Sequence, residues 1–362
     1  MKNTIEKRII GLMSGTSLDG LDIAYCLLRC DEEFRHVDFE LLAAETIPYP
    51  DTWTKRLAGL VDASAYEYAL TDVELGHYMG RCVRDFRQRH EGGVDAIASH
   101  GHTIFHQPHL RLTTQIGDGN AIAAETGLPV VYNFRQLDVA LGGQGAPLVP
   151  IGDKLLFGQY DGCLNLGGFS NISYEIEHQR IAYDVSPCNM ALNYLANLNH
   201  VVFDIDGKMA RQGKLNDTLL QRFNSLDYYG KPLPKSLGKE WFDSEFRPLL
   251  ATNDDSTETI NNHLRTVVEH IAQQVGLAVK NADLHSLLVT GGGAKNGFLI
   301  ERIKVYSTQC EIVVPKSEII DYKEAIIFAL LGFLRLYGKA NCLRSVTGAS
   351  TDNCGGCIAG LV

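Results

Sequence analysis

Blocks of apolar and polar positions alternate along the first part of the chain. Apolar runs at residues 8–13 and 21–28 flank the polar segment Ser14–Gly20, which is the pattern of a β-hairpin with a polar tip. A third strand is predicted at residues 36–46, and helical spacing follows through residues 81–89. The chain therefore begins with a small sheet and continues into a helix.

Strands and helices then alternate in two successive series. The first series predicts a strand, a helix and a strand at residues 94–99, about 118–126 and 128–132. The pattern restarts with strands at residues 162–166, 171–176 and 180–184 and a helix at residues 189–198, and it ends with a helix at 260–279, a buried strand at 287–289 and an apolar helix at 321–337. This alternation predicts the α/β class, and the two halves begin in the same way.

The length favours two domains, because 362 residues exceed what one hydrophobic core usually organises. No low-complexity linker separates the halves, so the boundary falls broadly between residues 135 and 160. We predict an N-terminal domain at residues 1–140 and a C-terminal domain at residues 141–362.

Composition excludes several classes of protein. The formal net charge of −10 lacks the basic footprint of a nucleic-acid binder. The longest apolar stretch, residues 325–336, is too short to span a bilayer, and no signal peptide is recognisable, so we expect a soluble protein of the cytoplasm. Nine cysteines are an odd number, which favours reduced thiols, and we interpret Cys354 and Cys357 as structural rather than as a redox or metal pair.

The hairpin tip carries the first candidate chemistry. Glycine permits positive φ and close approach, so the segment Ser14–Gly20 can present backbone N–H groups to a phosphate. The hydroxyls of Thr16 and Ser17 can add donors, and Asp19 and Asp22 are candidate partners of a Mg²⁺ ion through water. A plain structural turn explains the same residues equally well.

Two further glycine turns follow. Gly167 and Gly168 lie between two predicted strands, and Gly291, Gly292 and Gly293 leave a buried strand before a predicted helix. Neither a Walker P-loop nor a G-x-G-x-x-G motif occurs.

Three glycine turns on β-α-β units in two halves resemble the two phosphate loops and the adenosine loop of the actin-like ATPase and sugar kinase superfamily. Further motif blocks lie at residues 11–20 (GLMSGTSLDG), 99–103 (SHGHT), 115–119 (QIGDG), 133–138 (NFRQLD), 142–150 (GGQGAPLVP), 234–239 (PKSLGK), 291–296 (GGGAKN) and 323–325 (KEA). These blocks resemble those of the anhydro-N-acetylmuramic acid kinase family, and they run in family order across nearly the whole chain.

The resemblance implies a two-domain actin-like ATPase (ribonuclease H-like) fold with an active-site cleft between the domains. It implies ATP-dependent conversion of 1,6-anhydro-N-acetylmuramic acid and water to N-acetylmuramic acid 6-phosphate and ADP, a step of cell-wall sugar recycling. ATP would contact the two phosphate loops and the adenosine loop, at Gly15, Thr16, Ser17, Leu18, Asp19, Gly20, Leu21, Asp22, Gly167, Gly168, Gly291, Gly292, Gly293 and Asn296.

The family's catalytic base belongs to an Asp-Thr-Gly-Pro-Gly-Asn block, which here occupies residues 184–189. Asp184 is retained, so the resemblance implies that it activates the water that attacks the anomeric carbon. Ser186 and Cys188 replace two family glycines, and His102 stands where the family more often has Gln. These departures leave sugar specificity open, and Cys188 is expected to be a packing thiol.

Six residues in matching blocks are candidate contacts of the sugar: His100, Gly101, Arg135, Gln144, Asn189 and Glu324. We place His100 and Gly101 in a loop that follows an apolar strand, where exposed residues often face ligands. Arg135 and Gln144 suit the carboxylate of the substrate's lactyl group, although holding loops together would explain them as well. Glu324 could support the sugar or water, or only favour a helix dipole.

Two alternatives stay open. A conventional kinase acting on another amino sugar would use Asp184 to deprotonate the acceptor hydroxyl directly. A nucleotide-binding regulatory protein on the same fold is the other, because fold does not determine function. We expect a small-molecule substrate, no nucleic-acid or membrane partner, and a homodimer by resemblance alone.

Overall fold

The computed structural model describes residues 4–251, 254 and 256–360. The chain forms two compact units: unit 1 comprises Met1–Gly158 and Tyr322–Val362, and unit 2 comprises Gln159–Asp321. This division differs from the predicted one, because the chain returns to unit 1 for its last segment. Helix α13 (Ser317–Leu336) is the reason, since its apolar part, beyond Tyr322, packs on the sheet of unit 1.

Unit 1 is built on a sheet that has seven strands within the described ranges. The strands are β1 (Ile5–Ser14), β2 (Gly20–Cys30), β3 (Val37–Pro48), β4 (Ala96–Gln107), β5 (Leu112–Ile116), β6 (Val130–Tyr132) and β12 (Cys357–Ala359). Their order is β12-β6-β4-β1-β2-β3, with β5 paired to β4. β1 and β2 are antiparallel, which confirms the predicted hairpin, whereas β4 runs parallel to β1 and β6.

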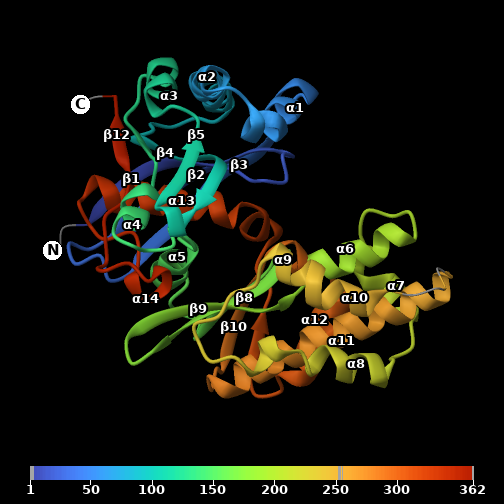
Figure 1. Ribbon diagram of the computed structural model, residues 1–362. Helices are drawn as coiled ribbons and strands as arrows, with labels where there is room; N and C mark the ends of the chain where they lie inside the picture. The colour runs from blue at the N-terminus through green and yellow to red at the C-terminus, as the bar shows by residue number, and fades with distance from the viewer. Residues whose placement is uncertain (1–3, 252–253, 255, 361–362) are drawn as a thin grey trace. The chain divides into compact units, whose positions relative to one another are not determined.

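Helices cover both faces of this sheet (Figure 1). One face packs on α1 (Asp51–Gly59), α2 (Ala65–Arg89) and α3 (Gly119–Thr126) through a cluster that includes Leu12, Met79 and Ile97. The other face packs on α13 so closely that a Cβ on Gly11 would lie 1.9 Å from the backbone oxygen of Ala325. The remaining helices of unit 1 are α4 (Gln136–Ala140), α5 (Val149–Leu156), α14 (Arg344–Thr347) and the short η1 (Leu60–Asp62) and η2 (Pro108–Leu110).

Unit 2 holds a five-stranded sheet within its described part, in the order β11-β10-β7-β8-β9. The strands are β7 (Gly162–Leu166), β8 (Phe169–Ile176), β9 (Gln179–Pro187), β10 (Ser286–Thr290) and β11 (Glu311–Val313). Its longer helices are α6 (Asn189–Leu198), α8 (Asp217–Asn224), α11 (Thr257–Asn281) and α12 (Gly297–Tyr306). Shorter segments are α7 (Lys208–Gln212), α9 (Lys239–Trp241), α10 (Arg247–Leu250), η3 (Ile205–Gly207), η4 (Asp227–Gly230), η5 (Phe242–Phe246) and η6 (Gly292–Lys295).

Side-chain caps define where many of these helices begin. Ser64 accepts a hydrogen bond from a backbone N–H of α2, and Ser256 does the same for α11. Asp118, Asn216 and Asn296 cap α3, α8 and α12 in the same way. Such caps satisfy N–H groups that have no partner within the helix, so these polar residues set the helix starts.

The mixed α/β, two-unit organisation expected from the sequence is confirmed.

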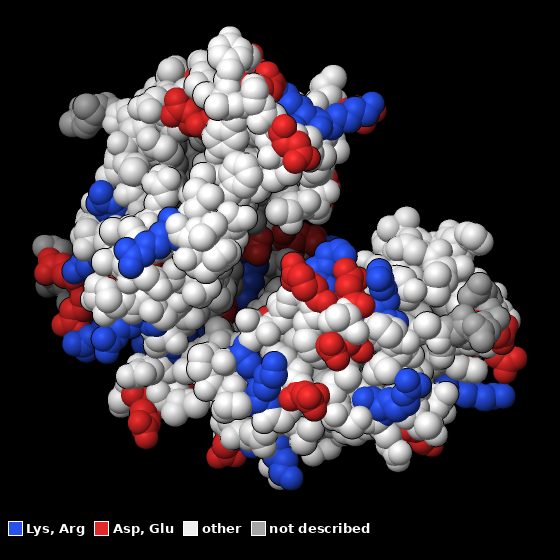
Figure 2. Space-filling model, in the orientation of Figure 1, with Lys and Arg blue, Asp and Glu red and all other residues white. Residues whose placement is uncertain are grey.

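Figure 2 shows Lys and Arg interspersed with Asp and Glu over the visible face. None of the described helices is both long enough and apolar enough to cross a bilayer.

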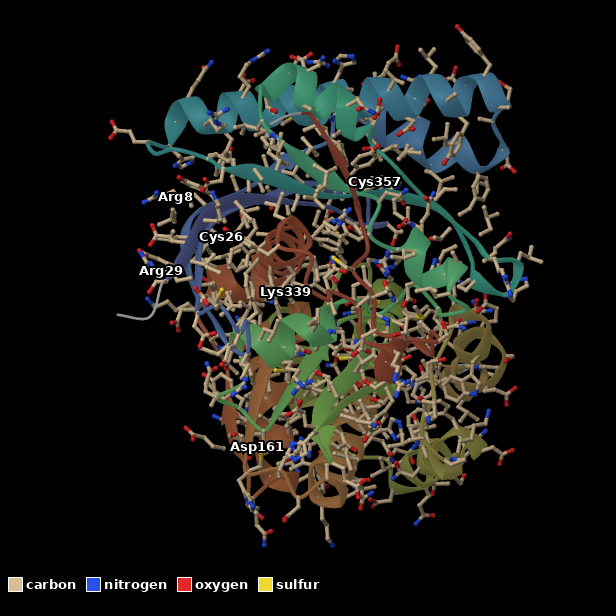
Figure 3. All side chains as sticks on the ribbon, turned by 90° about the vertical axis from the view of Figure 1, so that its left-hand side faces the viewer. Arg8, Cys26, Arg29, Asp161, Lys339 and Cys357 are labelled. Atoms are coloured by element: carbon tan, nitrogen blue, oxygen red, sulfur yellow. The ribbon has the colours of Figure 1, made fainter. Side chains whose placement is uncertain are left out.

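All nine cysteines lie in the described part of the chain and are free. Figure 3 places Cys26 on β2 and Cys357 on β12, where Cys357 is exposed. Within the described ranges, no cluster of three or more His, Cys, Asp or Glu could hold a metal ion.

Candidate functional site

The β1–β2 turn of unit 1 is a preformed loop with an exposed tip. Leu18 has a φ of 60°, its N–H donates to the Gly15 carbonyl at 3.3 Å, and Ser17 Oγ donates to Asp19 Oδ1 at 2.7 Å. A Cβ on Gly20 would lie 2.6 Å from the Ile47 carbonyl oxygen, so only glycine fits where the loop meets β3. The side chains of Thr16, Ser17 and Asp19 are accessible to a ligand at the tip.

Behind the tip, a buried chain of hydroxyls leads to His102. Tyr49 donates its hydroxyl hydrogen to Ser14 Oγ at 2.8 Å, and Ser14 Oγ lies 2.9 Å from His102 Nδ1. Burial lowers the pKa of His102. His102 therefore connects the first loop to β4, and the sequence did not indicate this contact.

His100, Gly101 and His102 lie within β4, and all three are buried. The prediction of an exposed loop at these positions is wrong, because β4 continues to Gln107 and pairs with β5 there. Gly101 has a φ of 76°, and a Cβ would lie 2.6 Å from the Ile116 carbonyl oxygen. Glycine at this position is thus explained by backbone geometry.

Arg135 forms hydrogen bonds with His100 and with Gly145, the residue that follows Gln144, and so links candidate sugar contacts of unit 1. Its Nε donates to His100 Nε2 at 3.0 Å, so His100 carries its proton on Nδ1, which lies 2.9 Å from the Gly101 carbonyl oxygen. Its Nη1 donates to the Gly145 carbonyl at 2.6 Å. Burial and the Arg135 charge hold the pKa of His100 well below its ordinary value, so the ring is neutral.

The charge of Glu324 interacts with that of the same guanidinium. Desolvation raises the pKa of its carboxyl, the positive charge of Arg135 opposes that rise, and the negative charge of Asp22 adds to it. Its side chain is nevertheless exposed. The charges of Arg135 and Asp22 thus act on the Glu324 carboxyl in opposite directions, although more than one hundred residues separate each of these three residues from the next in the sequence.

Unit 2 holds Asp184, on β9, in a constrained position. Leu237 N–H donates to Asp184 Oδ2 at 2.8 Å, and the backbone of Asp184 pairs with the Lys235 carbonyl at 3.3 Å and the Tyr228 hydroxyl at 2.6 Å. Burial raises the pKa of the Asp184 carboxyl. Its second oxygen, Oδ1, accepts no hydrogen bond from the residues that the structure describes. This carboxylate is oriented by one oxygen and open at the other.

The segment that orients Asp184, residues 234–239, was identified in the sequence as a matching block but was given no role beside Asp184. Lys235 lies with its Nζ 4.8 Å from the centre of the Tyr228 ring, and it donates to the carbonyls of Tyr228 and Tyr229 at 3.3 Å. The segment matched a family block, and that match was the available signal for a role beside Asp184.

The two glycine turns of unit 2 flank the same end of the sheet. The Gly167 and Gly168 carbonyls accept hydrogen bonds from the first N–H groups of α6, and Asn189 Nδ2 donates to the Leu166 carbonyl at 2.9 Å. Gly291 has a φ of 82°, and a Cβ there would lie 2.5 Å from Asn165 Oδ1. These contacts bring Asn189 and the two turns together.

Two residues that were predicted to contact ATP, Asn296 and Gly293, also have structural roles. Asn296 Oδ1 accepts from Leu299 N–H at 3.0 Å and so caps α12. Gly293 is buried, and a Cβ there would lie 2.7 Å from the Leu166 Cβ. A nucleotide contact by either residue stays a prediction.

The departures from the family block are buried within unit 2. Ser186 Oγ lies 2.9 Å from Ser170 Oγ, and neither serine is exposed. Cys188 is also buried, and burial raises the pKa of its thiol to about 12. The structure supports a packing role for Cys188, since a buried thiol with a high pKa is neither nucleophile nor ligand.

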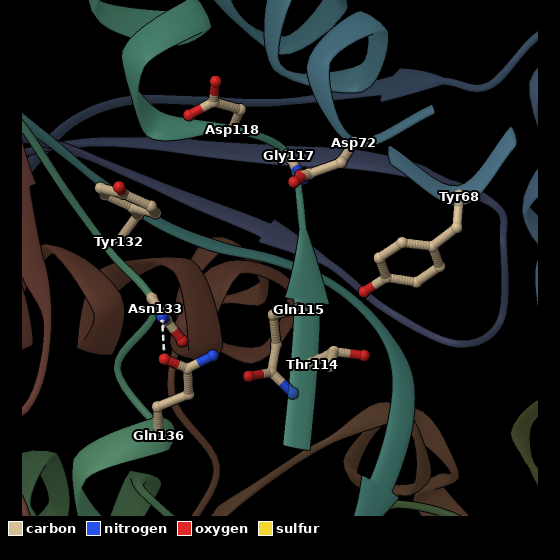
Figure 4. Close-up of a pocket in the computed structure, with 9 residues that line it drawn as sticks. All are labelled: Tyr68, Asp72, Thr114, Gln115, Gly117, Asp118, Tyr132, Asn133 and Gln136. Atoms are coloured by element: carbon tan, nitrogen blue, oxygen red, sulfur yellow. Dashed lines mark hydrogen bonds between the residues drawn. The ribbon is translucent and has the colours of Figure 1, made fainter. Parts of the chain in front are cut away.

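Unit 1 also contains a polar cavity of about 230 Å³ (Figure 4). Asn133 Nδ2 donates to Gln136 Oε1 at 2.6 Å across its lining. Asn133 Oδ1 and Gln115 Oε1 are buried and accept no hydrogen bond from any described residue. Both oxygens could accept a hydrogen bond from water or from a ligand.

Unit 1 thus has a turn-forming hydroxyl loop and unit 2 has an oriented carboxylate with a free oxygen, and phosphotransferases use each of these features. A family model described as Anhydro-N-acetylmuramic acid kinase matches residues 7–360. Curated proteins of that name are similar over almost their whole length. The protein of Sulfurovum sp. is 34% identical, covering 95% of this chain and 96% of that one, and the protein of Hydrogenovibrio crunogenus is 35% identical, covering 99% of each.

A third relative of that name, from Vibrio cholerae, is 36% identical over 94% of this chain and 95% of its own. Among solved structures, a ROK family glucokinase from Streptomyces griseus is similar with a TM-score of 0.41 and 14% identity, covering 90% of this chain and 98% of that one. The family match and the relatives show that the chain belongs to the anhydro-N-acetylmuramic acid kinase family. It is thus an enzyme, a sugar kinase.

Proposed function

We propose that this kinase uses ATP and water to convert 1,6-anhydro-N-acetylmuramic acid to N-acetylmuramic acid 6-phosphate and ADP. The observation that carries the proposal is the state of Asp184. Its carboxylate is desolvated, held at Oδ2 by Leu237 N–H and open at Oδ1, which is the arrangement that a general base requires.

The proposed reaction breaks two bonds and forms two others, and one proton moves to Asp184. Asp184 Oδ1 accepts a proton from water while the water oxygen forms a bond to the anomeric carbon. The bond between that carbon and O6 breaks, and O6 forms a bond to the γ-phosphorus as ADP leaves. The raised pKa of Asp184 makes it a stronger base than an ordinary carboxylate.

In this proposal, unit 1 holds the sugar and the first phosphate loop. Arg135 uses Nε and one Nη1 hydrogen for His100 and Gly145, and its remaining N–H groups suit the lactyl carboxylate. The hydroxyls of Thr16 and Ser17 suit the phosphates of ATP, and the glycine turns of unit 2 suit its second phosphate contact and its adenosine.

A Mg²⁺ ion fits this site, because Mg²⁺ keeps several waters and needs only one or two carboxylates besides phosphate oxygens. Asp19 lies on the loop, and Asp22 lies at the start of β2 with Oδ1 accepting from Thr46 Oγ1 at 2.6 Å. These two carboxylates would hold the ion through water, and the ion would neutralise charge on the transferred phosphoryl group.

Mass spectrometry of the product made in ¹⁸O-labelled water tests the proposal. The protein, ATP and Mg²⁺ are incubated with 1,6-anhydro-N-acetylmuramic acid, beside a panel of ordinary amino sugars. One ¹⁸O atom at the anomeric position of a 6-phosphosugar is expected. Unlabelled phosphosugar from a panel member would instead show a conventional kinase, and no phosphosugar at all would favour a nucleotide-binding regulatory protein.

A further inference from the structure

Asp138 lies on α4 of unit 1, fully buried, and its carboxylate joins parts of the chain that are far apart in the sequence. Oδ2 accepts a hydrogen bond from Gly145 N–H at 2.7 Å. Oδ1 accepts from Thr347 Oγ1 at 2.8 Å, Asn353 Nδ2 at 2.9 Å and Cys342 Sγ at 3.0 Å. All four partners are donors, which is the environment that an ionised carboxylate needs when buried.

The oxygen Oδ2 contacts the loop at residues 143–145, in which every residue forms a backbone hydrogen bond. Gly143 N–H donates to the Asp138 backbone carbonyl at 2.9 Å, and Gln144 N–H donates to the Thr347 carbonyl at 2.8 Å. The Gly145 carbonyl accepts from Arg135 Nη1 at 2.6 Å. Gly143 and Gly145 are buried while Gln144 between them is exposed, so the loop presents the Gln144 side chain from a fixed backbone.

Only glycine fits beside the carboxylate. A Cβ on Gly143 would lie 2.2 Å from Asp138 Oδ2, closer than any real contact of that kind. The close approach of the loop backbone to this buried oxygen therefore explains Gly143, whereas Gly142 and Gly145 have positive φ values of 86° and 67°, which favour glycine.

The oxygen Oδ1 faces a C-terminal segment that is itself closed into a loop. Asn341 Nδ2 donates to the Gly355 carbonyl at 2.9 Å, and Gly355 N–H donates back to Asn341 Oδ1 at 2.7 Å. Cys342 also forms a backbone bridge with Asn353. Burial and the neighbouring Asp138 charge raise the pKa of the Cys342 thiol, which keeps it protonated as a donor.

We propose that Asp138 is a positioning residue for recognition of the sugar's carboxylate. Through Oδ2 it sets the Gly145 backbone, and the Gly145 carbonyl in turn holds Arg135. Through Oδ1 it anchors that arrangement to the C-terminal segment. Arg135 and Gln144 then meet the lactyl carboxylate in a fixed geometry. This inference rests on the proposed function, because it requires a substrate that carries that carboxylate.

The substitution Asp138→Asn distinguishes the role of Oδ2 from the role of Oδ1. The amide oxygen stays toward the three donors at Oδ1, because turning the amide would place its NH₂ group against all three. The NH₂ group then takes the place of Oδ2 and meets Gly145 N–H, donor against donor. The variant therefore releases the loop and retains the anchor to the C-terminal segment.

Thr347→Val is the matched control. Valine keeps the shape of threonine and removes one donor to Oδ1, while the Oδ2 contact and the backbone carbonyl that holds Gln144 remain. Both variants are expected to lower the melting temperature. Only Asp138→Asn is expected to change recognition of the sugar.

Steady-state kinetics with two sugars provide the test. The substrate is the anhydromuramic acid sugar, and the comparison compound is the corresponding anhydro-N-acetylglucosamine, which lacks the lactyl carboxylate and is measured as an inhibitor. For Asp138→Asn we expect the substrate's KM to rise about tenfold or more, the scale of a lost charge-assisted contact, while the KM for ATP stays nearly unchanged. The inhibition constant of the comparison sugar should stay at the wild-type value. Thr347→Val should leave all three constants unchanged.

Equal changes for both sugars, or equal changes in Asp138→Asn and Thr347→Val, would show that Asp138 only stabilises the fold. If Asp138→Asn does not fold, the exposed Gln144→Ala replaces it, with the same selective rise in KM expected and its absence counting against the inference. A wild-type protein that makes no phosphosugar would overturn the proposed function itself, which separates the two failures.

Discussion

Replacing Asp184 by Asn should nearly abolish turnover and make the protein more stable. The asparagine oxygen can accept the hydrogen bond from Leu237 N–H that Asp184 Oδ2 accepts at 2.8 Å, so the segment at residues 234–239 keeps its position. An NH₂ group then occupies the position of Oδ1, where it cannot accept a proton from water. The change removes the base and little else.

The magnitude follows from the role of the carboxylate. Losing a positioned general base costs ~10²- to 10⁴-fold in kcat, or about 3–5 kcal/mol of barrier. The effect on stability has the opposite sign. Burial raises the pKa of Asp184, so its charge destabilises the folded protein above that pKa and the cost disappears as pH falls through the ordinary range of aspartate. The amide carries no charge to desolvate.

The assay combines product formation with ATP binding by calorimetry and thermal unfolding at several pH values. We expect ATP affinity within about twofold of wild type, a higher melting temperature for Asp184→Asn at pH 7, and convergence of the two proteins below about pH 4. Turnover at the wild-type rate would refute the assignment of the base. Loss of ATP binding would show instead that Asp184 is structural or lies in the metal sphere.

Three further predictions concern pH and packing. Wild-type kcat/KM should fall on the acid side through a pKa above that of an ordinary aspartate, and the pH profile checks whether this limb belongs to Asp184. The Lys323–Asp153 ion pair, 2.7 Å long, is almost fully buried, so Lys323→Met should lower the free energy of unfolding, measured by urea titration, by about 3–5 kcal/mol. Adding Asp153→Leu should recover most of the lost free energy. Gly11→Ala places a Cβ 1.9 Å from the Ala325 oxygen and should cost about 3 kcal/mol or more, measured in the same way, whereas a neutral result would mean that β1 and α13 separate easily.

Local patterns predicted the elements whose reasons are local. The strand at Gly162–Leu166 and the helix at Asn189–Leu198 were predicted with the bounds that the structure has, and the β1–β2 hairpin was predicted within a few residues. Apolar periodicity and turn chemistry act over a few neighbours, so one stretch of sequence is enough to read them. The short strands β5 and β12 gave no such signal, because each depends on pairing with a distant strand.

The candidate site likewise contains residues that the sequence indicated and residues that it did not. The motif at residues 184–189 pointed to Asp184, but not to Leu237, which orients its carboxylate. The sequence pointed to His100 and misplaced it in a loop, because the continuation of β4 depends on β5.

By itself the sequence determined the α/β class, the three glycine turns and the carboxylate expected to act as base, since each of these is written in contiguous residues. Only the tertiary structure decided that the chain returns to unit 1 after Asp321 and that Asp138 meets Cys342, 204 residues away. The physical reason is that a buried charge is stable only where several donors converge on it, and here the chain brings those donors from distant segments once it has folded.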